Sequence, residues 1–234
     1  MTQPAIILVH GFWGGAAHWA KVIPELAKAG HTDLHAVEMP LTSLADDAGR
    51  LKKMIAQRQG PVLLVGHSYG GAVITEAGGD AKVAGLVYVA AFSPDVGQSV
   101  GSLLAEIPAP ALVVDAAPDG FGFVQMETFK DGFAGDTSDA DAAFLRDSQV
   151  PIALSAFGTP VTQAAWRTKP SWAIVPTQDR AIDPRLLRQM AQKIGADVVE
   201  VEASHVPFLT QPRAVADVID KAARAASAGG GSAQ

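Results

Sequence analysis

Six short apolar runs, separated by segments with helical periodicity, place the strongest limits on the fold of this chain. The runs span residues 5–9, 34–37, 61–66, 83–92, 171–175 and 197–201, and the helical faces lie within 19–27, 44–55, 186–194 and 215–222. Most runs lack polar alternation, which is typical of strands buried on both faces of a parallel sheet. We therefore predict an α/β fold with a doubly wound, mainly parallel sheet of about six strands, helices on both faces and right-handed crossovers.

Composition excludes several functional classes. The 234 residues are 48% hydrophobic, which predicts one large globular core, and a net charge of −6 argues against nucleic acid or an anionic membrane as partner. There is no cysteine, so disulfides and thiolate chemistry are excluded. Neither a signal peptide nor a membrane span is recognisable, and no spacing is typical of metal ligands, so we expect a cytoplasmic protein without metal or cofactor. The oligomeric state is not indicated.

Residues 95–168 interrupt the alternation of strands and helices. This segment is rich in proline, glycine and acidic residues, and three stretches favour short helices, at 97–107, 139–148 and 159–166. Long segments inside compact domains are usually functional, so we expect a cap over a site in preference to a peripheral excursion. The predicted organisation is a core of residues 1–94 and 169–226, a cap of 95–168 and a flexible tail of 227–234.

A serine lies between two glycines at the end of the third apolar run, in the sequence VGHSYGG. Glycines at positions 66 and 70 permit a tight turn from strand to helix, where side chains would clash. Such a turn holds a serine hydroxyl above the sheet as a nucleophile, which makes Ser68 the candidate. Because Gly-x-Ser-x-Gly also arises by chance, a base and an acid are needed to support this interpretation.

The candidate base follows from the order of residues along the chain. A serine nucleophile needs a base, and in strand–turn–helix sites the order is serine, acid, histidine. Five of the six histidines precede the serine, and only His205 follows it, in a predicted loop after the last strand. We predict that His10 and His67, each beside a glycine, have structural roles.

Three aspartates are candidates for the acid. Asp179 comes four residues after the strand at 171–175 and has no evident local role. Asp183 precedes a proline and a helical face, as a helix N-cap does, and Asp95 fits a proline-initiated turn. We favour Asp179 as the carboxylate that orients the base, with Asp183 and Asp95 as the alternatives.

Acyl transfer also needs hydrogen-bond donors for the developing oxyanion. We expect these to be the main-chain N–H of Tyr69, after the serine, and that of Phe12, in the loop HGFWGG at 10–15. This glycine-rich loop matches neither the dinucleotide nor the P-loop phosphate motif. Four aromatic side chains are predicted to contact substrate, although each is also explained by core packing: Trp13, Phe92, Trp166 and Phe208.

The segments LVHGFWGGAAHW, GHSYGG, TQDRAI and SHVPFLTQP resemble the α/β-hydrolase superfamily, and more narrowly the small bacterial esterases related to plant methylesterases and hydroxynitrile lyases. The resemblance implies Ser68 as nucleophile, His205 as base, Asp179 as acid, and Phe12 and Tyr69 as oxyanion donors. It also implies that the first two strands of the family are absent. The lyases carry threonine and lysine where this chain has Gly11 and Val206, so the resemblance favours an esterase.

The expected function is that of a serine carboxylesterase, which cleaves small, mostly uncharged esters through an acyl-enzyme. The expected partner is a small-molecule ester. Three alternatives share the scaffold: a ligand-binding protein similar to hydrolase-like hormone receptors, a cofactor-free haloperoxidase or dioxygenase, and a hydroxynitrile lyase.

Overall fold

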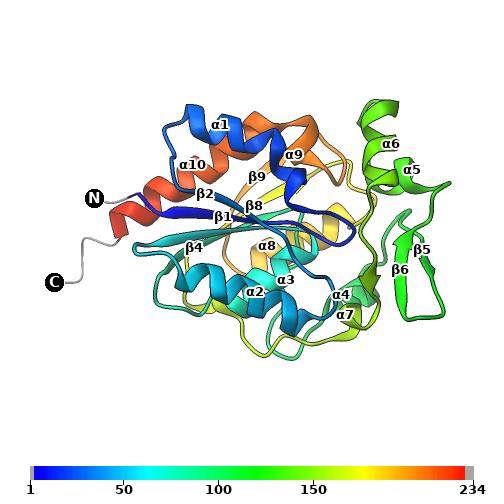
Figure 1. The fold of residues 1–234 in the computed structure, drawn as a ribbon, viewed down its shortest axis with the longest axis horizontal. Coiled ribbons are helices and arrows are strands. Elements are labelled where there is room, and N and C mark those ends of the chain that lie inside the picture. The colour runs from blue at the N-terminus through cyan, green and yellow to red at the C-terminus, as the bar shows by residue number, and fades with distance from the viewer. Residues whose placement is uncertain (1–2, 230–234) are drawn as a thin grey trace.

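The structure is a computed structural model that describes residues 3–229, and its centre is a six-stranded sheet (Figure 1). The strands are β1 (Ala5–Val9), β2 (Leu34–Val37), β3 (Val62–His67), β4 (Val83–Val89), β8 (Ser171–Pro176) and β9 (Asp197–Val201). All neighbouring pairs are parallel, in the order β2-β1-β3-β4-β8-β9. The predicted fold class is confirmed, and each apolar run singled out in the sequence contributes one strand.

Helices cover both faces of this sheet. On one face, α1 (Val22–Lys28), which follows the short 3₁₀ helix η1 (Ala16–Ala20), packs against α10 (Pro212–Gly229) (Figure 1). On the other face, α2 (Leu44–Ala56) packs against α3 (Tyr69–Ala77). The third helix of that face is α8 (Pro184–Lys193). Tyr88 of β4 shows this, because its side chain lies beside α8 and its hydroxyl is 2.9 Å from that of Thr75 in α3.

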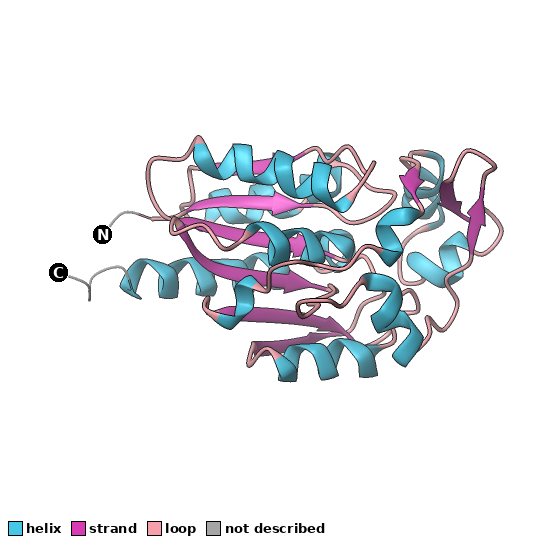
Figure 2. Ribbon diagram, turned by 90° about the horizontal axis from the view of Figure 1, so that it is seen from below, coloured by secondary structure: helices cyan, strands magenta, loops and turns pink. Residues whose placement is uncertain are grey.

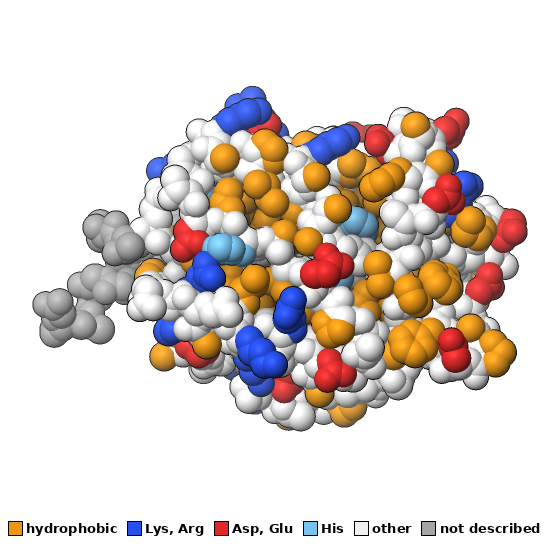
Figure 3. All heavy atoms as spheres, in the orientation of Figure 1, with side chains coloured by type: hydrophobic (Ala, Val, Ile, Leu, Met, Phe, Trp, Pro, Cys, Tyr) orange, Lys and Arg blue, Asp and Glu red, His pale blue; other side chains and the backbone are white. Residues whose placement is uncertain are grey.

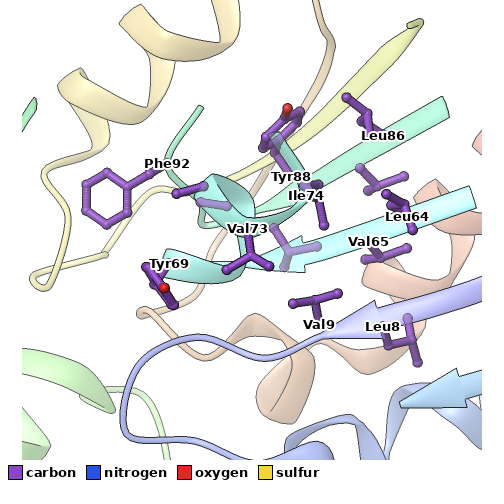
Figure 4. Packing of buried hydrophobic residues seen from close by; sticks show 14 of the residues in the cluster. Leu8, Val9, Leu64, Val65, Tyr69, Val73, Ile74, Leu86, Tyr88 and Phe92 are labelled. Atoms are coloured by element: carbon purple, nitrogen blue, oxygen red, sulfur yellow. The ribbon is translucent and has the colours of Figure 1, made fainter. Parts of the chain in front are cut away.

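The core lies where the central strands meet these helices. Figure 4 shows side chains of β1, β3 and β4 packed against those of α3. The residues of β1 and β3 are all buried, as expected for strands formed by the apolar runs at 5–9 and 61–66. Strand β9 lies at an edge, and its residues are exposed or half-buried.

Local sequence sets the ends of several helices. The Ser43 hydroxyl accepts the Asp46 N–H (3.0 Å) at the start of α2. The Asp183 carboxylate accepts the Arg185 N–H (2.8 Å) at the start of α8, with a proline at the first helical turn. Gly30 follows α1 with φ +96°, a conformation that favours glycine. Asp183 is therefore a helix cap, as its sequence context predicts.

Residues 95–168, here called the cap segment, form their own small layer. The helical elements are α4 (Val100–Glu106), α5 (Phe129–Phe133), α6 (Asp139–Asp147), α7 (Ser155–Gly158) and the 3₁₀ turn η2 (Ala165–Arg167). The strands β5 (Val114–Ala116), β6 (Phe121–Val124) and β7 (Ile152–Ala153) pair antiparallel in a sheet that the sequence analysis does not predict. The predicted helices at 97–107 and 139–148 are present, whereas 159–166 is mostly irregular.

The cap segment lies beyond the carboxyl ends of the main strands. In Figure 2 the arrowheads of the main sheet point towards the small sheet. Among the described residues, five large apolar side chains of this segment are exposed, and Figure 3 shows apolar atoms over this end of the molecule. They are Val96, Val113, Phe123, Met126 and Phe144.

Helix α10 continues through Gly229, so residues 227–229 of the predicted tail are helical. The rest of that tail, residues 230–234, lies outside the described residues. Across 3–229, no helix combines the length and the apolar character needed to cross a bilayer.

Candidate active site

Ser68 occupies a strained turn between β3 and α3. Its φ of 53° and ψ of −123° lie in a region that costs a non-glycine residue about 1–3 kcal/mol. A Cβ at Gly66 would lie 2.5 Å from the Gly70 oxygen, and a Cβ at Gly70 would lie 2.7 Å from the Val9 oxygen. Neither position can hold a side chain in this packing. The two glycines of the motif are therefore what allow the turn to close.

His205 and Asp179 form a buried pair. His205 lies in the loop between β9 and the short helix α9 (Pro207–Thr210), and its Nδ1 is 2.7 Å from Asp179 Oδ2. The other carboxylate oxygen accepts the N–H groups of Ala181 (2.8 Å) and Ile182 (2.9 Å). With the proton on Nδ1 donated to the carboxylate, Nε2 is free to act as a proton acceptor.

The other two acid candidates lie apart from this histidine. Asp183 caps α8 and pairs with Arg185 (2.8 Å). Asp95 pairs with Arg167 (2.7 Å) at the base of the cap segment. Of the three aspartates that the sequence left open, Asp179 is the one that contacts His205.

Ser68 and His205 line one narrow pocket, with a cavity volume of about 10 Å³. That volume is about one water molecule, so the pocket is nearly closed. Its apolar lining comes from core and cap segment together: Phe12, Trp13, Phe92, Leu104, Leu112, Phe157, Ala181 and Ile182. In the described chain, Ser68 and His205 supply the polar side chains of this lining. Leu104, Leu112 and Phe157, all from the cap segment, are half-buried and form the exposed side of the pocket.

The main-chain N–H groups of Phe12 and Tyr69 have no hydrogen-bond acceptor within residues 3–229. The Tyr69 amide begins α3, where the first N–H groups of a helix are unsatisfied by the helix itself. The rings of the two residues are stacked, with centroids 3.8 Å apart and an angle of 10° between planes. Two free donors thus belong to adjoining residues beside Ser68.

Of the four aromatic residues predicted to contact substrate, two line the pocket. Trp13 and Phe92 do so, and the Trp13 indole also donates to the Gly122 oxygen of the cap segment (3.1 Å). Trp166 lies instead at the base of the cap segment, where its indole donates to the Pro94 oxygen (2.9 Å). Phe208 is buried against His18 and other rings of the core.

Sequence reasoning missed the pocket residues of the cap segment, Phe157 above all. The Phe157 ring packs 4.7 Å from that of Phe12 and 6.1 Å from that of Trp13. It lies in a four-residue helix, too short to show periodicity. Only its aromatic character, in a segment expected to cover the site, could have drawn attention to it.

Three further histidines surround the site: His10 and His67 are buried, His18 is half-buried, and desolvation favours the neutral form of each. His10 Nε2 accepts the Met39 N–H (3.0 Å) while Nδ1 donates to the Gly11 oxygen (2.8 Å), and burial lowers the pKa of His10. Burial also lowers the pKa of His67 well below the usual value. The pKa of His18 is lowered to about 3, first by burial and then by the neighbouring His10 and His205. These side chains hold the main chain or pack against rings.

Comparison with known proteins identifies the family of the chain. The chain matches the alpha/beta hydrolase family over residues 6–218. It is 29% identical to the alpha/beta hydrolase nvfD of Aspergillus novofumigatus, over 95% of this chain and 98% of that protein. It is 37% identical to Methylesterase 7 of Arabidopsis thaliana over 41% of this chain and 42% of that protein.

Solved structures show the same fold. A pyrethroid hydrolase from Sphingobium faniae superposes with a TM-score of 0.82 at 23% identity, over 96% of this chain and 98% of that one. The strand–turn–helix at Ser68, the order of the sheet and the match along nearly the whole chain lead to one conclusion: this protein belongs to the α/β-hydrolase family.

Proposed function

We propose that the protein is a serine carboxylesterase in which Ser68 is the nucleophile, His205 the general base and Asp179 the orienting acid. The observation that carries this proposal is the 2.7 Å contact of His205 with Asp179 beside a pocket that Ser68 also lines. Esters are the substrate class because methylesterases occur among the relatives. No cofactor enters the proposed reaction.

The proposed reaction assigns one step to each of these groups. Ser68 Oγ attacks the ester carbonyl as its proton passes to His205 Nε2, and the carbonyl electron pair becomes an oxyanion. The Phe12 and Tyr69 amides stabilise that charge. The intermediate collapses, the alcohol leaves with the proton from His205, and an acyl-enzyme remains. Water then attacks by the same route and releases the acid, while Asp179 stays ionised throughout.

The pocket lining favours uncharged substrates of limited size. A charged group placed among its aromatic and aliphatic side chains would lose hydration without gaining a partner. The small cavity limits the acyl or alcohol portion unless the cap segment moves. Short, neutral esters, aromatic ones among them, fit this environment best.

Cyanohydrin cleavage is disfavoured by the space around Gly11. A Cβ at this position would lie 2.7 Å from the Ser68 Cβ, so the threonine of the related lyases has no room in this packing. Val206, in the place of their lysine, is fully buried and uncharged.

The decisive test is the Ser68→Ala variant, assayed with p-nitrophenyl acetate and butyrate. We expect kcat to fall by several orders of magnitude with unchanged stability, because a triad serine carries most of the rate enhancement. A fluorophosphonate should add covalently to the wild type at Ser68 and not to the variant. Ser171→Ala, at a buried serine of β8, is the matched control and should retain activity. Wild-type turnover in Ser68→Ala would refute the proposal.

A further inference from the structure

A carboxylate that the proposed reaction does not use is completely buried beside the site. Asp47, in α2, has no exposed surface, and no lysine, arginine or histidine within the described residues pairs with it. Its Oδ2 accepts the Tyr69 hydroxyl (2.7 Å), and its Oδ1 accepts the Leu41 N–H (2.9 Å). Both oxygens are therefore used, each by a neutral donor.

Burial of this carboxylate is unfavourable for folding by itself. Burial raises the pKa of Asp47, which means that the ionised form costs free energy in this environment. An asparagine or a well-packed apolar residue would avoid that cost. The hydrogen bond to Tyr69 is the contact through which Asp47 affects the proposed chemistry.

Tyr69 connects Asp47 to both free amide donors. Its own N–H is one of them, at the first residue of α3, and its ring is stacked 3.8 Å from the ring of Phe12, which carries the other. The Tyr69 side chain thus lies between a fixed anchor at its hydroxyl and the second donor residue at its ring face.

We propose that Asp47 and the Tyr69 hydroxyl are positioning residues of the oxyanion hole. The hydrogen bond fixes the Tyr69 ring, the stacked ring of Phe12 follows it, and the two amides keep the spacing that the tetrahedral oxyanion requires. This inference rests on the proposed esterase function. Stabilisation of an oxyanion depends on donors that are already in place when charge develops, so a small displacement of either amide lowers the rate.

Backbone strain at Ser68 explains why the Tyr69 side chain needs a fixed hydrogen-bond partner. Ser68 holds an unfavourable φ of 53°, and movement of the first turn of α3 would relieve it. The same movement would carry the Tyr69 amide away from the pocket. An anchored tyrosine side chain opposes that movement.

Asp47 also supports the attachment of the cap segment through Leu41. Leu41, whose N–H it accepts, has φ 56°, and the Leu41 oxygen accepts the Ala153 N–H of β7 (2.9 Å). Changes at Asp47 therefore disturb two regions at once. Tyr69→Phe removes the hydroxyl alone and keeps the stacked ring, so it is the sharper variant.

Tyr88→Phe is the matched control. Tyr88 is also a buried tyrosine whose hydroxyl has one side-chain partner, Thr75 (2.9 Å), and it does not line the pocket of Ser68. Both variants lose one buried hydrogen bond, and Tyr69→Phe should lose more unfolding free energy in urea because it leaves a buried carboxylate oxygen without a donor. They should differ in catalysis.

The experiment measures kcat, KM and inhibition by two ketones of equal chain length in wild type, Tyr69→Phe, Asp47→Asn and Tyr88→Phe. A trifluoromethyl ketone takes the Ser68 Oγ on its carbonyl carbon, the serine proton passes to His205, and the carbonyl oxygen becomes an anion in the hole. The methyl ketone probes binding without that charge.

We expect Tyr69→Phe to lower kcat about tenfold with little change in KM, and to raise the inhibition constant of the trifluoromethyl ketone about as much. Asp47→Asn should also lower kcat, but it should weaken the methyl ketone as well, because it disturbs the Leu41 contact of the cap segment. The methyl ketone should bind wild type, Tyr69→Phe and Tyr88→Phe alike, and Tyr88→Phe should match the wild type in every catalytic measurement.

Two outcomes would overturn the inference, and they differ from failure of the esterase proposal. Wild-type kcat and trifluoromethyl ketone affinity in a folded Tyr69→Phe would refute the positioning role alone. So would a loss of both ketones in equal measure, because that marks a general disturbance of the pocket. If the wild type neither hydrolyses esters nor reacts with a fluorophosphonate, the proposed function fails and the positioning role fails with it.

Discussion

The imidazole of His67 donates from Nε2 to the main-chain oxygen of His205, at 2.9 Å. His67 precedes Ser68 in the chain, and the two histidine rings lie 4.7 Å apart. This bond connects the end of β3 to the loop after β9 across the main sheet. The hydrogen bond thus links the loop of the proposed base to the residue that precedes the proposed nucleophile.

Replacement of His67 tests that connection. His67→Phe keeps a ring against Phe208 but cannot donate, which leaves a buried carbonyl unpaired at a cost of about 1–3 kcal/mol. We expect a lower unfolding free energy in urea and a lower kcat, because the loop of His205 loses its anchor. The control is His31→Asn, in the loop before β2, which disturbs the hydrogen bond of His31 to Asp220 in α10. It should affect stability without affecting kcat. Equal kcat in His67→Phe and wild type would show that the bond has no role in catalysis.

Two aspartates four residues apart should respond very differently to the same change. Asp179→Asn should lower kcat by about 10⁴-fold, because asparagine cannot stabilise the imidazolium or hold the required tautomer of His205. Asp183→Asn should lower it little, since asparagine caps a helix about as well. Steady-state kinetics on both variants, with circular dichroism to confirm folding, provide the measurement. The reverse ranking would assign the acid to Asp183.

Phe157 should limit the size of the substrate. Its half-buried ring is packed on Phe12 at the exposed side of the pocket, so Phe157→Ala opens space there. We expect kcat/KM for p-nitrophenyl octanoate to rise relative to the acetate. The control is Phe144→Ala, at a ring of α6 that is 62% exposed, and it should leave this ratio unchanged. An unchanged ratio in Phe157→Ala would remove this residue from the determinants of specificity.

Acid should destabilise the protein partly through His18. Its folded-state pKa of about 3 is below the ordinary value of 6.5, so the unfolded chain binds a proton that the folded chain does not between these values. The contribution of His18 to stability is complete above pH 6.5 and is lost as pH falls towards 3. For each unit by which the pH falls within this window, protonation of His18 in the unfolded chain lowers the unfolding free energy by about 1.4 kcal/mol.

His18→Phe isolates this contribution, because phenylalanine keeps a ring against Phe208 and cannot take up a proton. Between pH 7 and pH 5, the unfolding free energy measured with urea should fall less in the variant than in the wild type, by up to about 2 kcal/mol. The raised pKa of Asp47 acts in the opposite direction, but wild type and variant share it. Parallel losses in the two proteins would contradict the low pKa of His18.

The sequence predicted the strands of the main sheet because each is a local apolar run buried on both faces. It also identifies Ser68 and His205 as candidate site residues. Those selections needed only a short turn motif and the order of residues along the chain.

The cap segment was predicted as a unit but not in detail. Its strands have two to four residues, and β7 pairs with β6 across two intervening helices, so no local pattern predicts the small sheet. Nor does a local pattern show that the Trp166 indole binds the Pro94 oxygen while Phe157 lines the pocket.

The sequence by itself determined the parallel α/β core, the strained serine turn and the histidine that follows it, because periodicity, glycine spacing and chain order are local or linear properties. The tertiary structure decided that Asp179 and not Asp183 contacts His205, that Asp47 anchors Tyr69, and which aromatic rings surround Ser68. These relationships join residues 22 to 89 positions apart, and the distance between two side chains on different elements depends on the packing of everything between them.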